Sequence, residues 1–395
     1  MRKQPWLFGS LVIAMIASCG GSEDGTEDQG DIGIDPATGD MMDQGQDVGH
    51  VARVMTRNLY LGADLTPAIG APDLRSFVAA TGGVLRTVTA NDFTVRAKGL
   101  AAEILEADPD LIGLQEVALW RTGPASLEPL MGGRKTAKTV RYDFLQLLLN
   151  ELNADCERYQ VVVIQKEFDF EAPADENGVP GDGPVPIVDA ELNARLTMRD
   201  VILARVDGGV HTWNPRHGRF QHLLNVPILG GSVPVTRGWV RVDARVRGGR
   251  EFRFINTHLE AFDPPQLVPS IRAQQAAELL GPPALGKGGL PVVLVGDLNS
   301  DDDTVAEGDQ QAYQVLLAGG FVERSTSEPL SCCIQSEILT RGSVDDFDHQ
   351  VDHIMTNAPE LITLVSSSVT GREMVNGFWD SDHAGIVSAL HIREN

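Results

Sequence analysis

Carboxylate, amide and histidine side chains recur in this sequence where apolar runs end. The residues concerned are Asn58 after VARVMTR, Glu116 after LIGLQ, His258 after FRFINT, Asp297 and Asn299 in VVLVGDLN, Asp352 in HQVDHIM, and Asp382 and His383 before GIVSAL. Strand ends hold side chains on a rigid frame at one rim of a sheet. Hard divalent cations prefer oxygen ligands, and histidine transfers protons near neutral pH. The pattern therefore indicates a metal-assisted acid–base site.

The elements that must position these residues are strands and helices in a mixed order. Apolar, β-rich runs predict strands at 51–61, 111–117, 159–165, 199–206, 238–246, 251–259, 290–299, 351–356, 362–369 and 385–392. A helix is expected after Asp92, its N-cap, with Pro109 just past its end, and others at 270–280 and 310–318. Segments 121–140, 169–195 and 208–237 are rich in Gly, Pro and polar residues and are expected to be long loops. This mixture favours an α/β domain with layered sheets.

Six segments in order carry a family resemblance: NLY, LQEV, NTHLEA, GDLNSD, VDHIM and SDHAGI. Together they resemble the endonuclease/exonuclease/phosphatase superfamily, which includes deoxyribonuclease I, exonuclease III type apurinic endonucleases, bacterial sphingomyelinases and inositol polyphosphate 5-phosphatases. The resemblance spans about residues 51–392. It implies a four-layered α/β sandwich, with two packed mixed β-sheets flanked by helices, and hydrolysis of phosphodiester bonds by in-line attack of water.

The resemblance assigns a metal site to Asn58, Glu116 and Asp382. Glu116 would be the main ligand of Mg²⁺, with Mn²⁺ or Ca²⁺ as alternatives, and Asn58 would help to hold the metal or the phosphate. A divalent cation neutralises charge on the phosphoryl group under attack. The alternative for Glu116 is a solvated acid at a strand end. The number of metal ions is left open.

The same resemblance assigns catalysis to His258, Asp297, Asn299, Asp352 and His383. Asp297 would position or deprotonate the attacking water, and Asn299 would donate a hydrogen bond to a phosphoryl oxygen. His258 would protonate or stabilise the leaving oxygen. His383 would contact the phosphate, with Asp352 fixing its tautomer and raising its pKa. The alternatives are an Asx turn for the 297–299 pair and a core histidine for His258.

Three further residues near these motifs have weaker assignments. Arg199 and Asp200 could contact phosphate and orient a histidine, or form an ordinary ion pair at a strand end. Ser381 is expected to shape the turn before Asp382, because no GxSxG elbow supports a serine nucleophile.

The N-terminus indicates export. Residues 1–19 combine Arg2 and Lys3 with a short apolar run and end in IASC, which resembles the lipobox of bacterial lipoproteins. Cys19 would then be lipidated, anchoring the protein at the outer membrane or cell surface; the alternative is an ordinary secretory signal. Residues 20–50 hold nine acids, eight glycines and no Lys or Arg, which predicts a disordered tether. Residues 51–395 are interpreted as one domain.

Charge and cysteine content limit the partners. The formal charge is −23, and −16 remains for residues 51–395 once the +2 of the signal and the −9 of the tether are removed. This argues against a broad phosphate-binding patch, although Arg134, Lys135, Lys138 and Arg141 form one candidate basic strip. An exported domain could pair Cys156 with Cys332 or Cys333.

Three functions remain open at this stage. The first is a phosphodiesterase acting on nucleic acid, and the second cleaves phospholipid headgroups or inositol phosphates. The third is an inactive binding lipoprotein, which is disfavoured because every position needed for the chemistry is filled. The oligomeric state is not determined.

Overall fold

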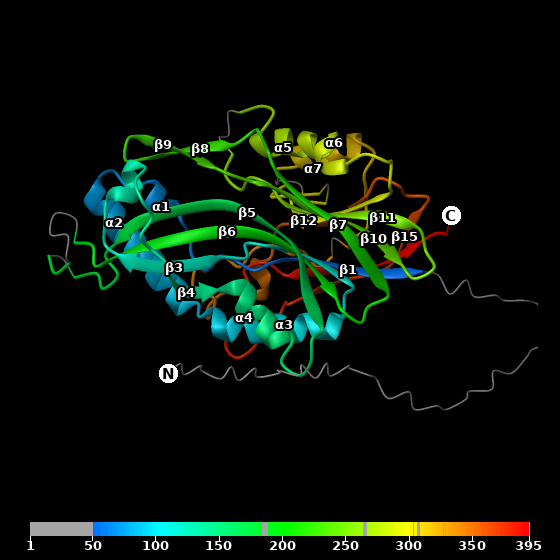
Figure 1. The fold of residues 1–395 in the computed structure, drawn as a ribbon, viewed down its shortest axis with the longest axis horizontal. Coiled ribbons are helices and arrows are strands. Elements are labelled where there is room, and N and C mark those ends of the chain that lie inside the picture. Colours follow the sequence, from blue (N-terminus) through cyan, green and yellow to red (C-terminus); the bar gives the residue numbers. More distant parts are fainter. Residues whose placement is uncertain are drawn as a thin grey trace, which may run out of the picture.

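Two large mixed β-sheets pack face to face and are flanked by helices, as the sequence predicts (Figure 1). The computed structural model describes residues 50–179, 181–183, 189–263, 267–302, 304–305, 309–326 and 328–394. The predicted signal with Cys19 and residues 20–49 of the predicted tether lie outside this range. Within it, no helix is long and apolar enough to cross a membrane.

The first sheet has eight strands in the order β15-β16-β1-β2-β6-β3-β4, with β5 also paired to β6. Their bounds are β1 Val51–Asn58, β2 Leu111–Gln115, β3 Leu119–Pro124, β4 Thr139–Asp143, β5 Tyr159–Ala174, β6 Leu192–Arg205, β15 Ile362–Thr370 and β16 Gly385–Ile392. β1 and β2 are parallel, and β16 runs antiparallel to β1.

The second sheet has six strands in the order β13-β14-β12-β11-β10-β7. Their bounds are β7 Val210–Arg219, β10 Gly238–Val246, β11 Glu251–His258, β12 Val292–Asp297, β13 Val322–Glu323 and β14 Asp352–Thr356. A separate hairpin consists of β8 Leu224–Ile228 and β9 Gly231–Val235. β11 and β12 are parallel, while β14 is antiparallel to β12.

Helices cover the outer faces of both sheets (Figure 1). On the first sheet lie α1 Thr66–Ile69, α2 Leu74–Ala90, α3 Phe93–Ala107 and α4 Phe144–Leu152; on the second lie α5 Ile271–Leu279, α6 Pro282–Leu285 and α7 Gln311–Ala318. Two short 3₁₀ turns span Glu128–Met131 and Val344–Asp346. Asp92 caps α3 as predicted, since its side chain accepts a hydrogen bond from the backbone N–H of Thr94.

The core between the sheets is apolar and includes a buried polar crosslink. Valine, isoleucine and phenylalanine side chains from β1, β6, β10, β11, β12, β14 and β16 fill it. Asn256 Nδ2 donates to the carbonyl oxygens of Leu114 and Val201, and its Oδ1 accepts from Gln115 Nε2 at 2.6 Å. Because buried amides must be satisfied, these bonds help to set the register between the sheets. That register determines how the strand ends meet.

Two predicted loops are wrong. Most of segment 208–237 forms β7, β8 and β9, and segment 169–195 contains the end of β5 and the start of β6. β7 contains Pro215 and lies at an edge of its sheet, where a residue without an N–H is tolerated. The helices α2 and α4 were not predicted either.

Candidate active site

The predicted side chains meet at one rim of the two sheets. Asn58 and Gln115 are register partners at the ends of parallel β1 and β2, with Glu116 next. In the other sheet Asp297 is the register partner of both His258 and Asp352. Parallel strands end at the same edge, and β14 begins there because it is antiparallel to β12. The topology therefore brings together residues that are up to 325 positions apart in the sequence.

Asp297 lies at the centre of this group. Its Oδ2 accepts a hydrogen bond from Asn58 Nδ2 at 2.9 Å, which links the two sheets. The same oxygen lies 3.4 Å from His258 Nε2 and 3.8 Å from His383 Nε2. All four residues are buried. A carboxylate between two imidazoles can accept or relay a proton.

His383 is held by Asp352. The distance from His383 Nδ1 to Asp352 Oδ2 is 2.9 Å, and Ser331 Oγ donates to the same oxygen at 2.8 Å. Burial opposes the imidazolium charge, but Asp352 and Asp297 outweigh it and raise the pKa of His383 well above its ordinary value. Ser381 Oγ accepts a hydrogen bond from the backbone N–H of His383 at 3.3 Å, which closes the turn, and its hydroxyl donates to the carbonyl oxygen of Asn58.

His258 has the opposite electrostatic surroundings. Arg237 Nη1 lies 3.1 Å from its Nδ1 and can only donate, so Nδ1 accepts and the proton lies on Nε2. Burial, reinforced by the Arg237 charge, lowers the pKa of His258 to about 3. The histidine is therefore neutral and presents an N–H toward Asp297. Arg237, just before β10, was missed by the sequence analysis because no motif surrounds it.

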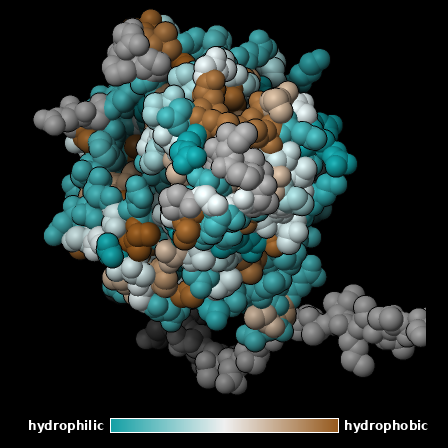
Figure 2. All heavy atoms as spheres, turned by 90° about the vertical axis from the view of Figure 1, so that its left-hand side faces the viewer, coloured by the Kyte–Doolittle hydropathy of each residue, from teal (hydrophilic) through white to brown (hydrophobic). Residues whose placement is uncertain are grey.

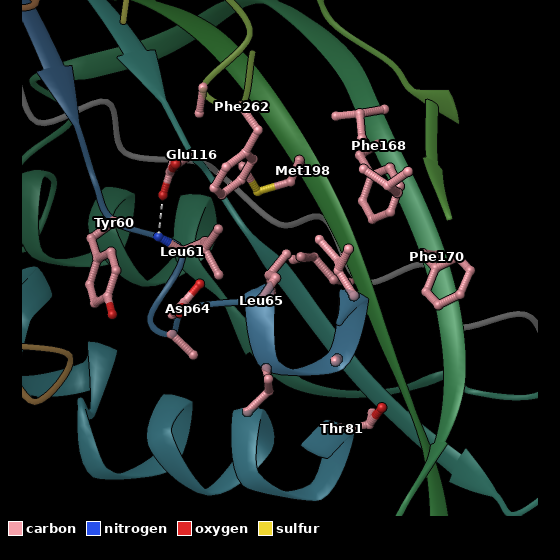
Figure 3. A pocket seen from close by; sticks show the side chains of 18 of the residues that line it. Tyr60, Leu61, Asp64, Leu65, Thr81, Glu116, Phe168, Phe170, Met198 and Phe262 are labelled. Carbon is pink, nitrogen blue, oxygen red and sulfur yellow. Dashed lines mark hydrogen bonds between the residues drawn. The ribbon is translucent and has the colours of Figure 1, made fainter. Parts of the chain in front are cut away.

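Glu116 and Asp382 form the acidic end of the site. Glu116 has a positive φ of 54°, and its Oε2 accepts from the backbone N–H of Leu61 at 2.6 Å (Figure 3). Burial is the larger of two causes that raise the pKa of Glu116 to about 7, and the negative charge of Asp382 is the other. Burial likewise raises the pKa of Asp382. Two carboxylates that repel one another in a poorly hydrated place favour a bound cation.

The donor set fits a hard divalent cation. Within the described part of the chain, ligand-type atoms of Asp297, Asp352 and His383 lie within 4.8 Å of one another. This group is distinct from the predicted ligands Glu116 and Asp382, whose carboxylates act on one another electrostatically. Asp352 Oδ1 and Asp200 Oδ2 are buried carboxylate oxygens without a hydrogen-bond partner, and such oxygens can bind a cation. Oxygen ligands of this kind suit Mg²⁺ or Mn²⁺.

The remaining predicted residues have structural partners. Asn299 is partly exposed; its backbone N–H donates to Asp297 Oδ1 at 2.8 Å, so the Asx turn is present, and its Nδ2 donates to the carbonyl oxygen of Leu259. Arg199 donates to the carbonyl oxygens of Val117 and Ala118 and pairs with Asp143 at 2.6 Å. That arrangement favours the ion-pair interpretation of Arg199, with Asp143 rather than Asp200 as its partner.

Asp200 belongs to a buried charged cluster with Glu167, Arg237 and Glu260. Burial raises the pKa of Asp200 and of Glu167 well above the ordinary values, and neither oxygen of Glu167 has a hydrogen-bond partner. Arg237 Nε lies 3.8 Å from Glu260 Oε2. The carboxyl groups of this cluster surround the Arg237 guanidinium, which in turn orients His258. The cluster therefore helps to hold Arg237 in place.

The cysteine expectation needs correction. Cys332 and Cys333 are joined to one another by a disulfide, so neither pairs with Cys156. Their sulfurs lie 3.7 and 3.8 Å from His383 Nε2, in the loop that also supplies Ser331. The spacing of the cysteines in the sequence did not reveal this proximity, because the loop is held at the site by hydrogen bonds to distant residues, including the backbone of His349, Asp382 and Ala384.

Comparisons with known proteins agree with this fold. A family model described as the Endonuclease/Exonuclease/phosphatase family matches residues 82–383. An endonuclease/exonuclease/phosphatase family protein from Leptotrichia buccalis is 14% identical, with a TM-score of 0.50 over 86% of this chain and 99% of that chain. No curated protein sequence matches significantly.

Two other solved structures are similar at lower TM-scores. The mannosyl-6-phosphatase of Bacteroides thetaiotaomicron is 16% identical, with a TM-score of 0.48 over 86% of this chain and 99% of that chain. The human nocturnin catalytic domain is 16% identical, with a TM-score of 0.46 over 87% of this chain and 96% of that chain.

Proposed function

The chain belongs to the endonuclease/exonuclease/phosphatase family, whose named activities all hydrolyse phosphoesters, and we propose that it is a divalent-metal-dependent phosphodiesterase using in-line attack of water. The observation that carries the proposal is Asp297 Oδ2 lying between His258 Nε2 and His383 Nε2, at 3.4 and 3.8 Å. One carboxylate and two imidazoles of opposite protonation supply a base, a neutral donor and a cationic donor at one place.

Glu116 and Asp382 would hold the cation, with Asn58 beside them. When bound, Mg²⁺ or Mn²⁺ would neutralise charge on the phosphoryl group and polarise it. The proposal is supported by the raised pKa values of both carboxyls, since a cation would restore their ionised forms.

The protein's own residues would perform the proton chemistry. Asp297 orients the attacking water and accepts its proton, being fixed by Asn58 Nδ2. His383, a cation held by Asp352, donates from Nε2 to a phosphoryl oxygen. Neutral His258 donates its Nε2 proton in a hydrogen bond to the leaving oxygen. Preorganised donors of this kind stabilise charge that develops in the transition state.

The basic strip gives limited support to a nucleic acid substrate. Lys135 Nζ lies 2.5 Å from Asp169, and Arg141 pairs with Glu176. Side chains engaged in ion pairs contact phosphates less readily, and the overall charge is −23. Phospholipid and inositol phosphate substrates therefore stay as the alternative class.

The deciding experiment compares the full chain with Asp297→Asn and Glu116→Gln variants. Hydrolysis of bis-p-nitrophenyl phosphate, plasmid DNA, RNA and phospholipid vesicles is followed with Mg²⁺, with Mn²⁺ and with chelator. We expect metal-dependent hydrolysis that each variant lowers by 10²-fold or more. Circular dichroism confirms that the variants fold. Hydrolysis that survives chelation or both substitutions would overturn the mechanism.

We also propose that the protein is exported and anchored through Cys19. The support is the IASC segment followed by an acidic, glycine-rich stretch, which would hold the enzyme away from the membrane surface. In a bacterial host, labelled palmitate should enter the wild type and leave Cys19→Ser unlabelled. Release of both forms into the medium without label would instead identify an ordinary secretory signal.

A further inference from the structure

A cavity of about 500 Å³ opens beside the acidic end of the active site. Glu116 and Asp382 line it, so it is continuous with the proposed metal site. Figure 3 shows Glu116 at one end of this space and the rings of Phe168 and Phe170 toward the other. Its volume falls within the range of pockets that enclose small organic ligands. The proposed chemistry does not use this space.

The cavity wall away from the site is apolar. It is built from α1, α2, β5 and β6, and its lining includes Leu65, Ile69, Phe77, Phe168, Phe170 and Met198. The hydroxyl of Thr81, which also lines it, donates to the carbonyl oxygen of Phe77. Glu116, Asp382 and Arg237 line the other end, where Arg237 contacts His258. The cavity therefore has one reactive end and one hydrophobic end.

Exposed apolar side chains also lie at the outer rim of the cavity. Phe262 lines the cavity and is 48% exposed, and Leu229 at the tip of the β8–β9 hairpin is 37% exposed. Ile228 and Val235 of that hairpin line the cavity as well. Figure 2 shows hydrophobic side chains gathered on this face beside a hollow. Exposed apolar side chains that frame a pocket indicate an apolar ligand or surface.

We propose that this cavity binds the aliphatic chain of a lipid phosphoester whose phosphate lies at Asp297, His258 and His383. The identification of the chain as part of the substrate rests on the proposed function. Water attacks phosphorus, the new P–O bond forms, the bond to the other ester oxygen breaks, and that oxygen leaves protonated as the alcohol. A nucleobase fits less well, because its polar edge would be left unpaired against the apolar wall.

The first test measures dependence on chain length. The full chain is assayed with methyl, butyl and octyl p-nitrophenyl phosphate diesters in Mg²⁺, below their micellar concentrations. These substrates share one reacting group and differ only in the chain. Each buried methylene should raise kcat/KM by about four-fold until the cavity is filled. An equal kcat/KM for the methyl and octyl esters would overturn the inference.

Variants locate the effect. Ala68→Phe places a ring in the cavity from α1, and Phe170→Ala removes part of its wall; both positions are partly exposed, so the fold should tolerate the changes. We expect both to reduce the octyl-to-methyl ratio of kcat/KM by ten-fold or more. Ala79→Phe, at an exposed position of α2 outside the cavity, is the matched control and should keep the wild-type ratio.

A second test does not require catalysis. Trp120 lines the cavity, so tryptophan fluorescence can report the binding of n-alkanols from butanol to decanol without metal. Alkanol affinity could rise with chain length in the wild type and not in Ala68→Phe while no diester is cleaved. That result would reject the proposed function and show that the cavity is a binding site for apolar chains. If the diesters are cleaved and neither assay depends on chain length, the inference that the cavity binds an aliphatic chain is rejected and the proposed function stands. If alkanols bind but cleavage does not depend on chain length, the cavity has no role in substrate binding.

Discussion

His383 Nδ1 lies 2.9 Å from Asp352 Oδ2, and this contact joins the loop before β16 in one sheet to the first residue of β14 in the other. Ser331 Oγ donates to the same carboxylate oxygen, so Asp352 is held from two sides. The arrangement fixes the tautomer of His383 and turns its Nε2 toward Asp297. The proposed proton chemistry therefore depends on a contact between the two sheets.

Replacing Asp352 with Asn should lower kcat by about 10²- to 10⁴-fold with a smaller change in KM. The cationic form of His383 is favoured because Asp352 and Asp297 raise its pKa well above the ordinary value, so the wild type should stay active far into the alkaline range. Without the Asp352 charge the pKa falls, and the alkaline limb of the pH–rate profile should move to lower pH. Asp348→Asn, at an exposed acid nearby, should keep the wild-type profile. An unmoved limb in Asp352→Asn would contradict the assigned role.

Replacing Arg237 with Leu should affect both stability and catalysis. The change removes the donor to His258 Nδ1 and leaves the buried carboxyls of Glu167, Asp200 and Glu260 without their cation, so the free energy of unfolding should fall by about 3 kcal/mol. The pKa of His258, now held near 3 by burial and by Arg237, should rise and change the acid limb of the pH–rate profile. Arg237→Lys retains the charge and should recover stability more than kcat. Equal kcat in all three proteins would exclude a positioning role.

His353 should make stability depend on pH. It is buried, its Nδ1 lies 2.9 Å from Glu323 Oε2, and its Nε2 donates to the carbonyl oxygen of Ser300. Burial opposes the charge, but Glu323 prevails and raises the pKa to about 9. Because the folded pKa exceeds the unfolded value of 6.5, the stabilisation is full below about pH 6.5 and is lost as the pH rises through 9.

The measurement for His353 is urea unfolding at pH 6, 7.5 and 9.5. On the order of 3 kcal/mol of stability should disappear across this range in the wild type, and most of that dependence should be missing in His353→Gln. His217→Gln, at an exposed position of β7, serves as the control. The same slope in all three proteins would show that His353 does not cause it.

Gly113 of β2 packs closely against the second sheet. A Cβ there would lie 2.5 Å from Val295 Cγ2 and 2.7 Å from Asn256 Oδ1, so Gly113→Ala should destabilise the protein by about 1–3 kcal/mol. Gly83→Ala in α2 meets only the end of Arg86, at 3.7 Å, and should be stabilising by about 0.5–1 kcal/mol. Urea unfolding at one pH compares the two variants. A Gly113→Ala protein as stable as the wild type would show that the sheets can move apart.

The sequence by itself determined most strands and the residues at their ends. Apolar runs with a strand-like length are local patterns, so β1, β2, β11 and β12 and the polar residues that end them could be predicted without a structure. β7 was not predicted because it contains Pro215, a residue that is tolerated in an edge strand but argues against a strand in the sequence. The helices α2 and α4 were not predicted either.

The tertiary structure decided which distant side chains act together. The bond between Asn58 and Asp297 spans 239 positions, and Arg237 reaches His258 across neighbouring strands. The cavity beside Glu116 likewise takes its walls from two helices and two strands. Such contacts depend on how the sheets and helices pack, and packing joins residues whose separation along the chain carries no local pattern. The motifs therefore predicted the chemistry, and the fold alone decided its partners and the shape of the space beside it.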